Sequence, residues 1–91
     1  MTLTIRVPSP LRAAAGGART LPIEATSLPE LRSALRTSYP ELAALVLEAD
    51  AFGSAVSVFV DGEDVRFLPA DADLRAARVV ELLPAMSGGQ G

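Results

Sequence analysis

The chain has 91 residues, a formal net charge of −3 and an isoelectric point near 4.7, and 49% of its residues are hydrophobic against 21% charged. This length and balance fit one folded domain rather than a disordered segment. The chain contains no Cys, His or Lys. That composition excludes disulfides, thiolate nucleophiles, metal centres held by Cys or His, imidazole bases, and mechanisms that need a Schiff-base or P-loop lysine.

Charge and hydropathy also argue against two kinds of partner. A nucleic-acid-binding protein ordinarily carries a basic stripe, whereas acids and arginines are interspersed here. No run approaches the ~18 apolar residues that a membrane-spanning helix needs, and the first residues lack the pattern of a secretory signal. We therefore expect a cytoplasmic protein that binds neither nucleic acid nor membrane.

The N-terminal quarter of the chain predicts two strands. Residues 2–7 alternate between polar and apolar side chains, as a half-buried strand does, and Pro8 ends the pattern. Gly16 and Gly17 mark a turn or loop, after which residues 19–24 resume the alternation. Because Pro22 has no N–H to donate, this second strand should lie at the edge of a sheet.

A helix follows over residues 27–38. Ser27 and Glu30 have the spacing of a capping box, and the leucines that follow recur at helical intervals to form one buried stripe. Pro40 ends this helix, because the residue before a proline is disfavoured in the α conformation. The same proline can begin a second, shorter helix over residues 40–48.

The C-terminal half predicts a hairpin and a last strand. Residues 55–60 are rich in Val, and Asp61-Gly62 is a strong hairpin turn before a second strand over residues 63–67. Residues 71–77 predict a turn with a short helical piece. Residues 79–83 are apolar on both faces apart from one glutamate, as expected of a central strand.

The order of these elements indicates an α+β domain. The first and last strands are the most strongly patterned, so we expect them to lie at the centre of the sheet as a parallel pair, with the main helix covering one face. This arrangement is a β-grasp (ubiquitin-like) fold, with a mixed sheet of four to five strands, one main helix and a short second helix. We expect this domain to occupy residues 1–84, followed by a flexible tail over residues 85–91.

Two segments resemble a known family. They are Val60-Asp61-Gly62-Glu63-Asp64-Val65-Arg66-Phe67 and Val79-Val80-Glu81-Leu82-Leu83-Pro84-Ala85-Met86-Ser87-Gly88-Gly89. The second is similar to the ending of the MoaD/ThiS family of ubiquitin-like sulfur carriers, in which a hydrophobic strand leads through a proline to Gly-Gly. The first is most similar to the branch that supplies sulfur for cysteine biosynthesis.

The resemblance implies a carrier rather than an enzyme. In this family an adenylating enzyme of the ubiquitin-activating type uses ATP to activate the C-terminal glycine, and sulfur then replaces AMP to give a thiocarboxylate. A sulfide-using synthase is the second partner. On this reading Gly88 and Gly89 form the sulfur-carrying terminus, and the carrier itself holds no cofactor.

The chain departs from the family by continuing past Gly89 with Gln90-Gly91. Some relatives carry such extra residues, which a metalloprotease removes. We expect cleavage between Gly89 and Gln90, which would make the encoded chain a precursor. The alternatives are that Gly91 is the activated terminus, or that the extra residues are a harmless tail.

Five residues are predicted to contact partners: Met86, Pro84, Phe59, Phe67 and Arg66. A β-grasp leaves one sheet face open, and an apolar patch there would be a docking surface. The strand of Phe59 presents two alternating sets of side chains, and the sequence does not decide which set faces outward. Arg66 could instead be an ordinary surface arginine paired with a nearby Asp.

No catalytic or metal-binding residue is predicted. The acidic residues of 63–64 and 71–73 fall in turns, where such residues are common for backbone reasons. The main alternative is a ubiquitin-like binding module that never transfers sulfur, and a small hydrolase is a weaker one. If the chain is a carrier, the recipient pathway could also be that of molybdopterin, thiamin, methionine or a natural product.

Overall fold

The computed structural model describes residues 2–49 and 51–85. In this part of the chain the main sheet has five strands in the order β2-β1-β7-β5-β6. The central strands β1 and β7 run parallel, and the remaining neighbours are antiparallel. The strands are β1 (Thr2–Arg6), β2 (Thr20–Glu24), β5 (Val56–Val60), β6 (Glu63–Asp64) and β7 (Val79–Pro84). The predicted β-grasp, with its central parallel pair, is confirmed.

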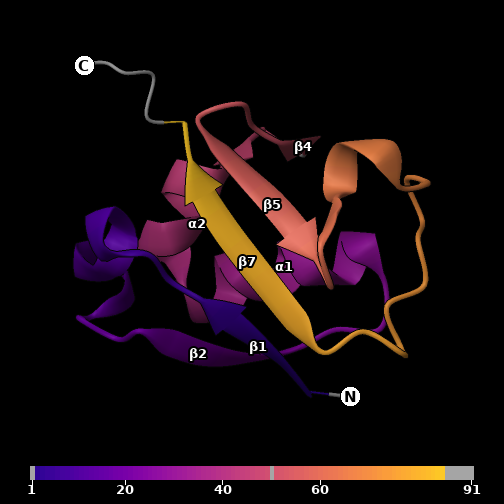
Figure 1. The fold of residues 1–91 in the computed structure, drawn as a ribbon, viewed down its shortest axis with the longest axis horizontal. Coiled ribbons are helices and arrows are strands. Elements are labelled where there is room, and N and C mark those ends of the chain that lie inside the picture. The colour runs from indigo at the N-terminus through magenta and orange to yellow at the C-terminus, as the bar shows by residue number, and fades with distance from the viewer. Residues whose placement is uncertain (1, 50, 86–91) are drawn as a thin grey trace.

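Helices cover one face of this sheet and leave the other open (Figure 1). The two α-helices are α1 (Leu28–Ser38) and α2 (Pro40–Val46). Two 3₁₀ helices, η1 (Ser9–Ala15) and η2 (Val65–Phe67), lie in the connections, and β3 (Leu47–Glu48) pairs with β4 (Ala51–Phe52) as a small separate sheet. The predicted edge position of the second strand is confirmed, since β2 pairs with β1 alone.

The core lies between the sheet and α1. Alternate residues of β1, β5 and β7 point toward the helices and are buried, and so are the leucines of the predicted helical stripe. The inward-facing side chains of the strands and the apolar stripe of the helix therefore pack together as one aliphatic layer. The side chains most completely buried in this layer are Leu3, Ile5, Leu31, Leu35, Leu42, Val46, Val58 and Val80.

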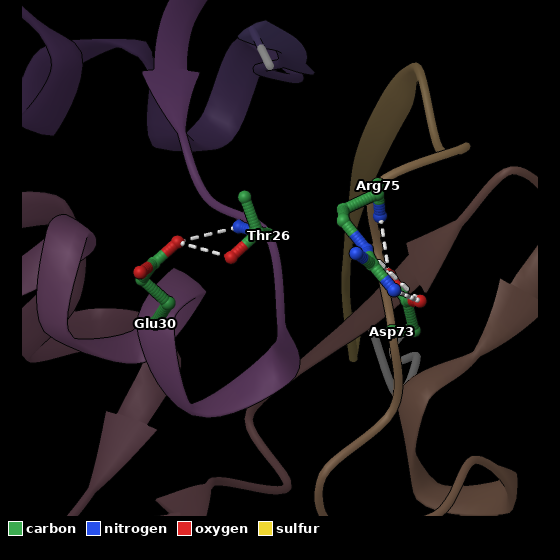
Figure 2. A network of polar contacts seen from close by, with 4 residues as sticks. All are labelled: Thr26, Glu30, Asp73 and Arg75. Atoms are coloured by element: carbon green, nitrogen blue, oxygen red, sulfur yellow. Dashed lines mark hydrogen bonds and ion pairs between the residues drawn. The ribbon is translucent and has the colours of Figure 1, made fainter.

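The N-terminus of α1 is capped as predicted, with one difference. The Ser27 hydroxyl accepts a hydrogen bond from the Glu30 N–H at 3.3 Å. The Glu30 carboxylate reaches back one residue further than the standard capping box, and accepts from the backbone N–H and the hydroxyl of Thr26 (Figure 2). The same turn is tied to the segment before β7, because the Leu28 N–H donates to the Ala72 carbonyl at 3.0 Å.

Two connections differ from the prediction. Residues 9–15, for which no helix is predicted, form η1, because Pro10 sets helical φ near its start and Gly16 ends it in the left-handed conformation at φ 67°. The short helical piece expected within residues 71–77 is absent, and turns with a single bridge between Ser27 and Asp73 take its place.

Two elements end earlier than predicted. The strand expected over residues 63–67 ends at Asp64, because the Asp64 carboxylate accepts a hydrogen bond from the Arg66 N–H at 2.8 Å and turns the chain into η2. The second helix ends at Val46 rather than Glu48, since Leu47 turns extended and begins β3.

Candidate functional site

The candidate site is the carboxyl end of β7 together with the open sheet face beside it. Pro84 is the last residue of β7 and lies opposite Val56 of β5. The Ala85 N–H donates to the Ala55 carbonyl at 2.8 Å. The point at which the chain leaves the sheet is therefore fixed against the beginning of β5.

The other end of β7 is fixed by one carboxylate. Asp61 sits in the hairpin turn at φ 49° and accepts hydrogen bonds from the backbone N–H groups of Val79 (2.9 Å) and Arg78 (3.1 Å). These hydrogen bonds favour the charged carboxylate and hold the pKa of Asp61 below its usual range. A strand anchored at both ends gives the C-terminal segment a defined starting point.

The open face next to β7 carries a patch of two apolar side chains, Phe59 and Leu83, and one acidic side chain, Glu81. Phe59 is half-buried and lies opposite Glu81, and Leu83 is 57% exposed. Together with Gly62 and Leu82 they line a shallow hollow of about 290 Å³. The structure thus settles what the sequence left open: Phe59 faces outward and the valines of β5 face the core. We call Phe59, Glu81 and Leu83 the open-face patch.

An ion pair borders this patch. The Arg6 guanidinium lies 3.4 Å from the Glu81 carboxylate on the neighbouring strand, and both side chains are about half exposed or more. An exposed pair of this kind contributes little stability, so a binding partner can displace it at small cost.

Phe67 and Arg66 lie on η2. Phe67 is 85% exposed, which suits the partner contact predicted for it. Arg66 is not free, because its guanidinium makes two-point hydrogen bonds to the buried Asp64 carboxylate, the shortest at 2.7 Å. This contact lowers the pKa of Asp64 and raises that of Arg66. The alternative interpretation of Arg66, an arginine paired with a nearby Asp, is confirmed.

The same local geometry recurs nine residues later. Arg75 binds Asp73 through its guanidinium at 2.7 Å and its backbone N–H at 2.9 Å, as Figure 2 shows. The Arg75 side chain, and then its backbone N–H, lower the pKa of Asp73 to about 2. These carboxylates are therefore engaged with arginine. Over residues 2–49 and 51–85 no cluster of three acidic side chains is placed to hold a metal ion.

Leu83 is the site residue that sequence reasoning missed. The apolar run of β7 hides its alternation in the sequence, but Glu81 indicates it, because a residue two positions from an exposed glutamate shares its sheet face.

Five residues of the predicted site lie outside the described residues, and their predicted roles stay predictions: Gly88, Gly89, Gly91, Gln90 and Met86. None of the described helices is both long and apolar enough to span a bilayer.

Comparison with known proteins gives one family and several similar folds. The ThiS family model matches residues 5–89. A chain of the BexX/CysO complex of Amycolatopsis orientalis superimposes with a TM-score of 0.81 at 24% identity, covering 96% of this chain and 99% of that chain. CysO of Mycobacterium tuberculosis, described as an antigen, gives 0.76 at 25% identity, covering 91% and 98%.

The archaeal small modifier protein 1 of Methanosarcina acetivorans is also similar in fold. It has a TM-score of 0.77 at 22% identity, with coverage of 97% of this chain and 96% of that chain. No curated protein sequence matches the chain significantly.

Proposed function

Because the chain belongs to the ThiS family of ubiquitin-like sulfur carriers, we propose that it carries sulfur as a C-terminal thiocarboxylate and donates it to a biosynthetic enzyme. The observation that carries this proposal is the family match, which covers all but the first residues of the β-grasp and reaches Gly89. The open-face patch and the anchored end of β7 support it, because they offer a docking surface next to the point where the C-terminal segment begins.

The proposed chemistry takes place on a partner enzyme. A carboxylate oxygen of the terminal glycine attacks the α-phosphate of ATP, and pyrophosphate leaves. Sulfide then attacks the acyl carbon of the adenylate, the bond to AMP breaks, and a thiocarboxylate remains. Glycines lack Cβ atoms, so Gly88 and Gly89 can enter a narrow site without steric conflict. The carrier needs no catalytic side chain of its own, and ATP is bound by the enzyme.

We propose that Gly89 becomes the reactive terminus after removal of Gln90 and Gly91. The family match ends at Gly89, so the two residues that follow lie beyond the matched pattern. A trimming metalloprotease would then control when the carrier becomes active.

For the recipient pathway we favour cysteine biosynthesis. This choice is supported by the segment from Val60 to Phe67 and by the structural likeness to CysO. The first partner would be an adenylating enzyme that docks on the open-face patch, and the second a sulfide-using synthase. The chain has no Cys, which fits a reducing compartment, and we place the carrier in the cytoplasm. That a similar chain is found in the BexX/CysO complex supports the expectation of protein partners.

Mass spectrometry tests the proposal directly. The chain ending at Gly89 is incubated with its adenylating enzyme, ATP and a sulfide source. We expect the mass gain of one oxygen replaced by sulfur, located on the C-terminal peptide. A Gly89→Pro variant is the control, because its ring and fixed φ should prevent entry into a narrow site. An unmodified terminus in the unaltered chain would favour the competing function, a ubiquitin-like binding module.

The trimming step needs a separate comparison. The full-length chain and the chain ending at Gly89 are incubated with the adenylating enzyme alone, without a protease. We expect only the shorter chain to be modified. Equal modification of the full-length chain would show that Gly91 can serve as the terminus and that trimming is unnecessary.

A further inference from the structure

A second hollow lies beside the carboxyl end of β7, next to the open-face patch. It has a volume of about 350 Å³ and forms where β1 ends, η1 begins and β2 starts. Its lining contains three arginines and one acid among eight residues: Arg6, Arg12, Arg19, Glu81, Val7, Pro8, Thr20 and Leu82. We call this the arginine pocket.

Two of the three guanidinium groups have no carboxylate partner within the described part of the chain. Arg12 is held by uncharged acceptors, with its Nε donating to the Val7 carbonyl at 3.1 Å and its Nη1 to the Ser9 hydroxyl at 3.0 Å. Arg19 forms no ion pair there, and Arg6 has only the 3.4 Å contact with Glu81. Arg66 and Arg75, by contrast, each bind an Asp at 2.7 Å.

The arginine pocket is therefore a local excess of positive charge on a protein whose net charge is −3. Its position is also specific. β1 pairs with β7 only as far as Arg6 opposite Glu81, and the chain then leaves the sheet for η1 (Figure 1). The pocket lies at this point, beside Glu81 and Leu82 of β7. The lining includes Leu82, two residues before the end of β7, so the pocket lies close to the point where the C-terminal segment begins.

We propose that the arginine pocket receives an acidic segment, with two or more carboxylates, of the protein that binds the C-terminus of this chain. This inference rests on the proposed function, which supplies that partner. Guanidinium groups match carboxylates in two-point geometry, and the fixed Arg12 loses little freedom on binding. The half-buried Pro8 beside the arginines suits the hydrocarbon of a peptide better than a free inorganic anion.

The pocket can be tested without any partner enzyme. The ¹⁵N-labelled chain is titrated at low salt with an acetylated tetraglutamate peptide while the Nε–H signals of Arg12 and Arg19 are followed by NMR. We expect saturable shifts that disappear in the double variant Arg12→Gln/Arg19→Gln. Glu81→Gln should tighten binding, because it releases Arg6. Equal or larger shifts with inorganic phosphate would replace the proposal with a simple anion site, and no shift would overturn it.

The second experiment measures the partner. The carrier concentration that half-saturates the adenylating enzyme is compared for Arg12→Gln/Arg19→Gln and for the control Arg32→Gln/Arg78→Gln, which removes the same charge outside the pocket. We expect a rise of about tenfold in the first variant, shrinking at high salt, and little change in the control. Circular dichroism confirms that both remain folded.

The two proposals fail in different ways. If the unaltered chain is never adenylated, the proposed function is wrong, whatever the NMR titration shows. If it is adenylated and both double variants behave alike, the proposed function stands and the assignment of the arginine pocket is overturned.

Discussion

At the scale of single residues, Asp61 links the hairpin turn to the strand that leads to the C-terminus. It adopts a left-handed conformation that Asp tolerates better than most residues. Its carboxylate accepts from the N–H of Val79, the first residue of β7, and from the N–H of Arg78 just before it. One residue thus adopts the backbone conformation that the turn requires and also holds the beginning of the central strand β7 in place. The sequence predicts the turn from Asp61-Gly62, but not the contacts to Arg78 and Val79, which are 17 and 18 residues away.

Asp61→Ala should lower the free energy of unfolding by about 1 kcal/mol, because the two N–H groups lose their acceptor and must turn to water. Asp61→Asn is the matched control. Its amide oxygen can still accept from both groups, and Asn also tolerates positive φ, so the loss should be smaller. Urea denaturation of the three proteins measures the difference. If the Ala variant is as stable as the unaltered chain, these hydrogen bonds contribute nothing.

At the scale of elements, two adjacent residues of β7 have different roles: one stabilises the core, and the other lies on the proposed docking surface. Leu82 is 5% exposed and faces the core, whereas Leu83 is 57% exposed in the open-face patch. Both are leucines of one strand, so their different environments decide the effect of truncation. This contrast gives a matched pair of substitutions.

Leu82→Ala should cost about 2–4 kcal/mol of unfolding free energy, since it leaves a cavity in the core. Leu83→Ala should change stability by less than about 0.5 kcal/mol. We expect it instead to raise the carrier concentration that half-saturates the adenylating enzyme by about fivefold, as loss of an interface contact does. Urea denaturation and the adenylation assay separate the two effects. Unchanged adenylation of Leu83→Ala would remove Leu83 from the docking surface.

The edge strand β2 is protected against pairing with another chain. Pro22 has no N–H to offer, and its carbonyl accepts a hydrogen bond from the Tyr39 hydroxyl at the end of α1. Proline and a covered carbonyl together interrupt the row of backbone groups that an edge otherwise presents. The position of Pro22 was readable in the sequence, whereas its contact with Tyr39 was not.

The double variant Pro22→Thr/Tyr39→Phe should self-associate, because it restores an N–H and frees a carbonyl in the middle of β2. Size-exclusion chromatography with light scattering should show a larger mass than the unaltered chain at the same concentration. Pro22→Thr alone is the control and should associate less, since Tyr39 still covers the carbonyl. A double variant with unchanged mass would show that other features close this edge.

The elements that the sequence predicts well are those with strong local patterns. The strands at either end, α1 and the hairpin turn follow from alternation, leucine spacing and Asp61-Gly62. The misjudged elements depend on contacts made by side chains. η2 forms because Asp64 captures the Arg66 N–H, a hydrogen bond that competes with continuation of β6. η1 gives no amphipathic signal because it is short and rich in Ala.

At the scale of the whole molecule, the sequence predicts the fold and the family but only half of the candidate site. It selects Phe59 and Phe67 correctly as exposed or partly exposed aromatics. It cannot determine which face of β5 is covered, because alternation defines two sets and only packing of α1 chooses between them. It also cannot find the arginine pocket, whose members come from four elements that the fold brings together: β1, η1, β2 and β7.

Acid sensitivity is a further property of the whole molecule. The pKa values of Glu30, Asp61, Asp64 and Asp73 are all lowered by hydrogen bonds that the folded chain provides. Hydrogen bonds from Thr26 act on Glu30, and those of arginine side chains dominate at Asp64 and Asp73. A carboxyl group with a lower pKa in the folded state binds fewer protons there than in the unfolded state. Acid therefore favours unfolding.

We accordingly expect the free energy of unfolding to be constant from about pH 8 to pH 5, because the chain has no histidine and no other side chain that ordinarily titrates in that range. Below pH 4.5, the ordinary value for Glu, stability should decline steadily as the pH approaches about 2, the pKa of Asp73. Urea denaturation at intervals across this range measures the curve. Asp73→Asn should flatten its lowest part, since the group with the strongest shift no longer titrates. A stability change centred between pH 6 and 7, or a gain on acidification, would contradict this account of the charged groups.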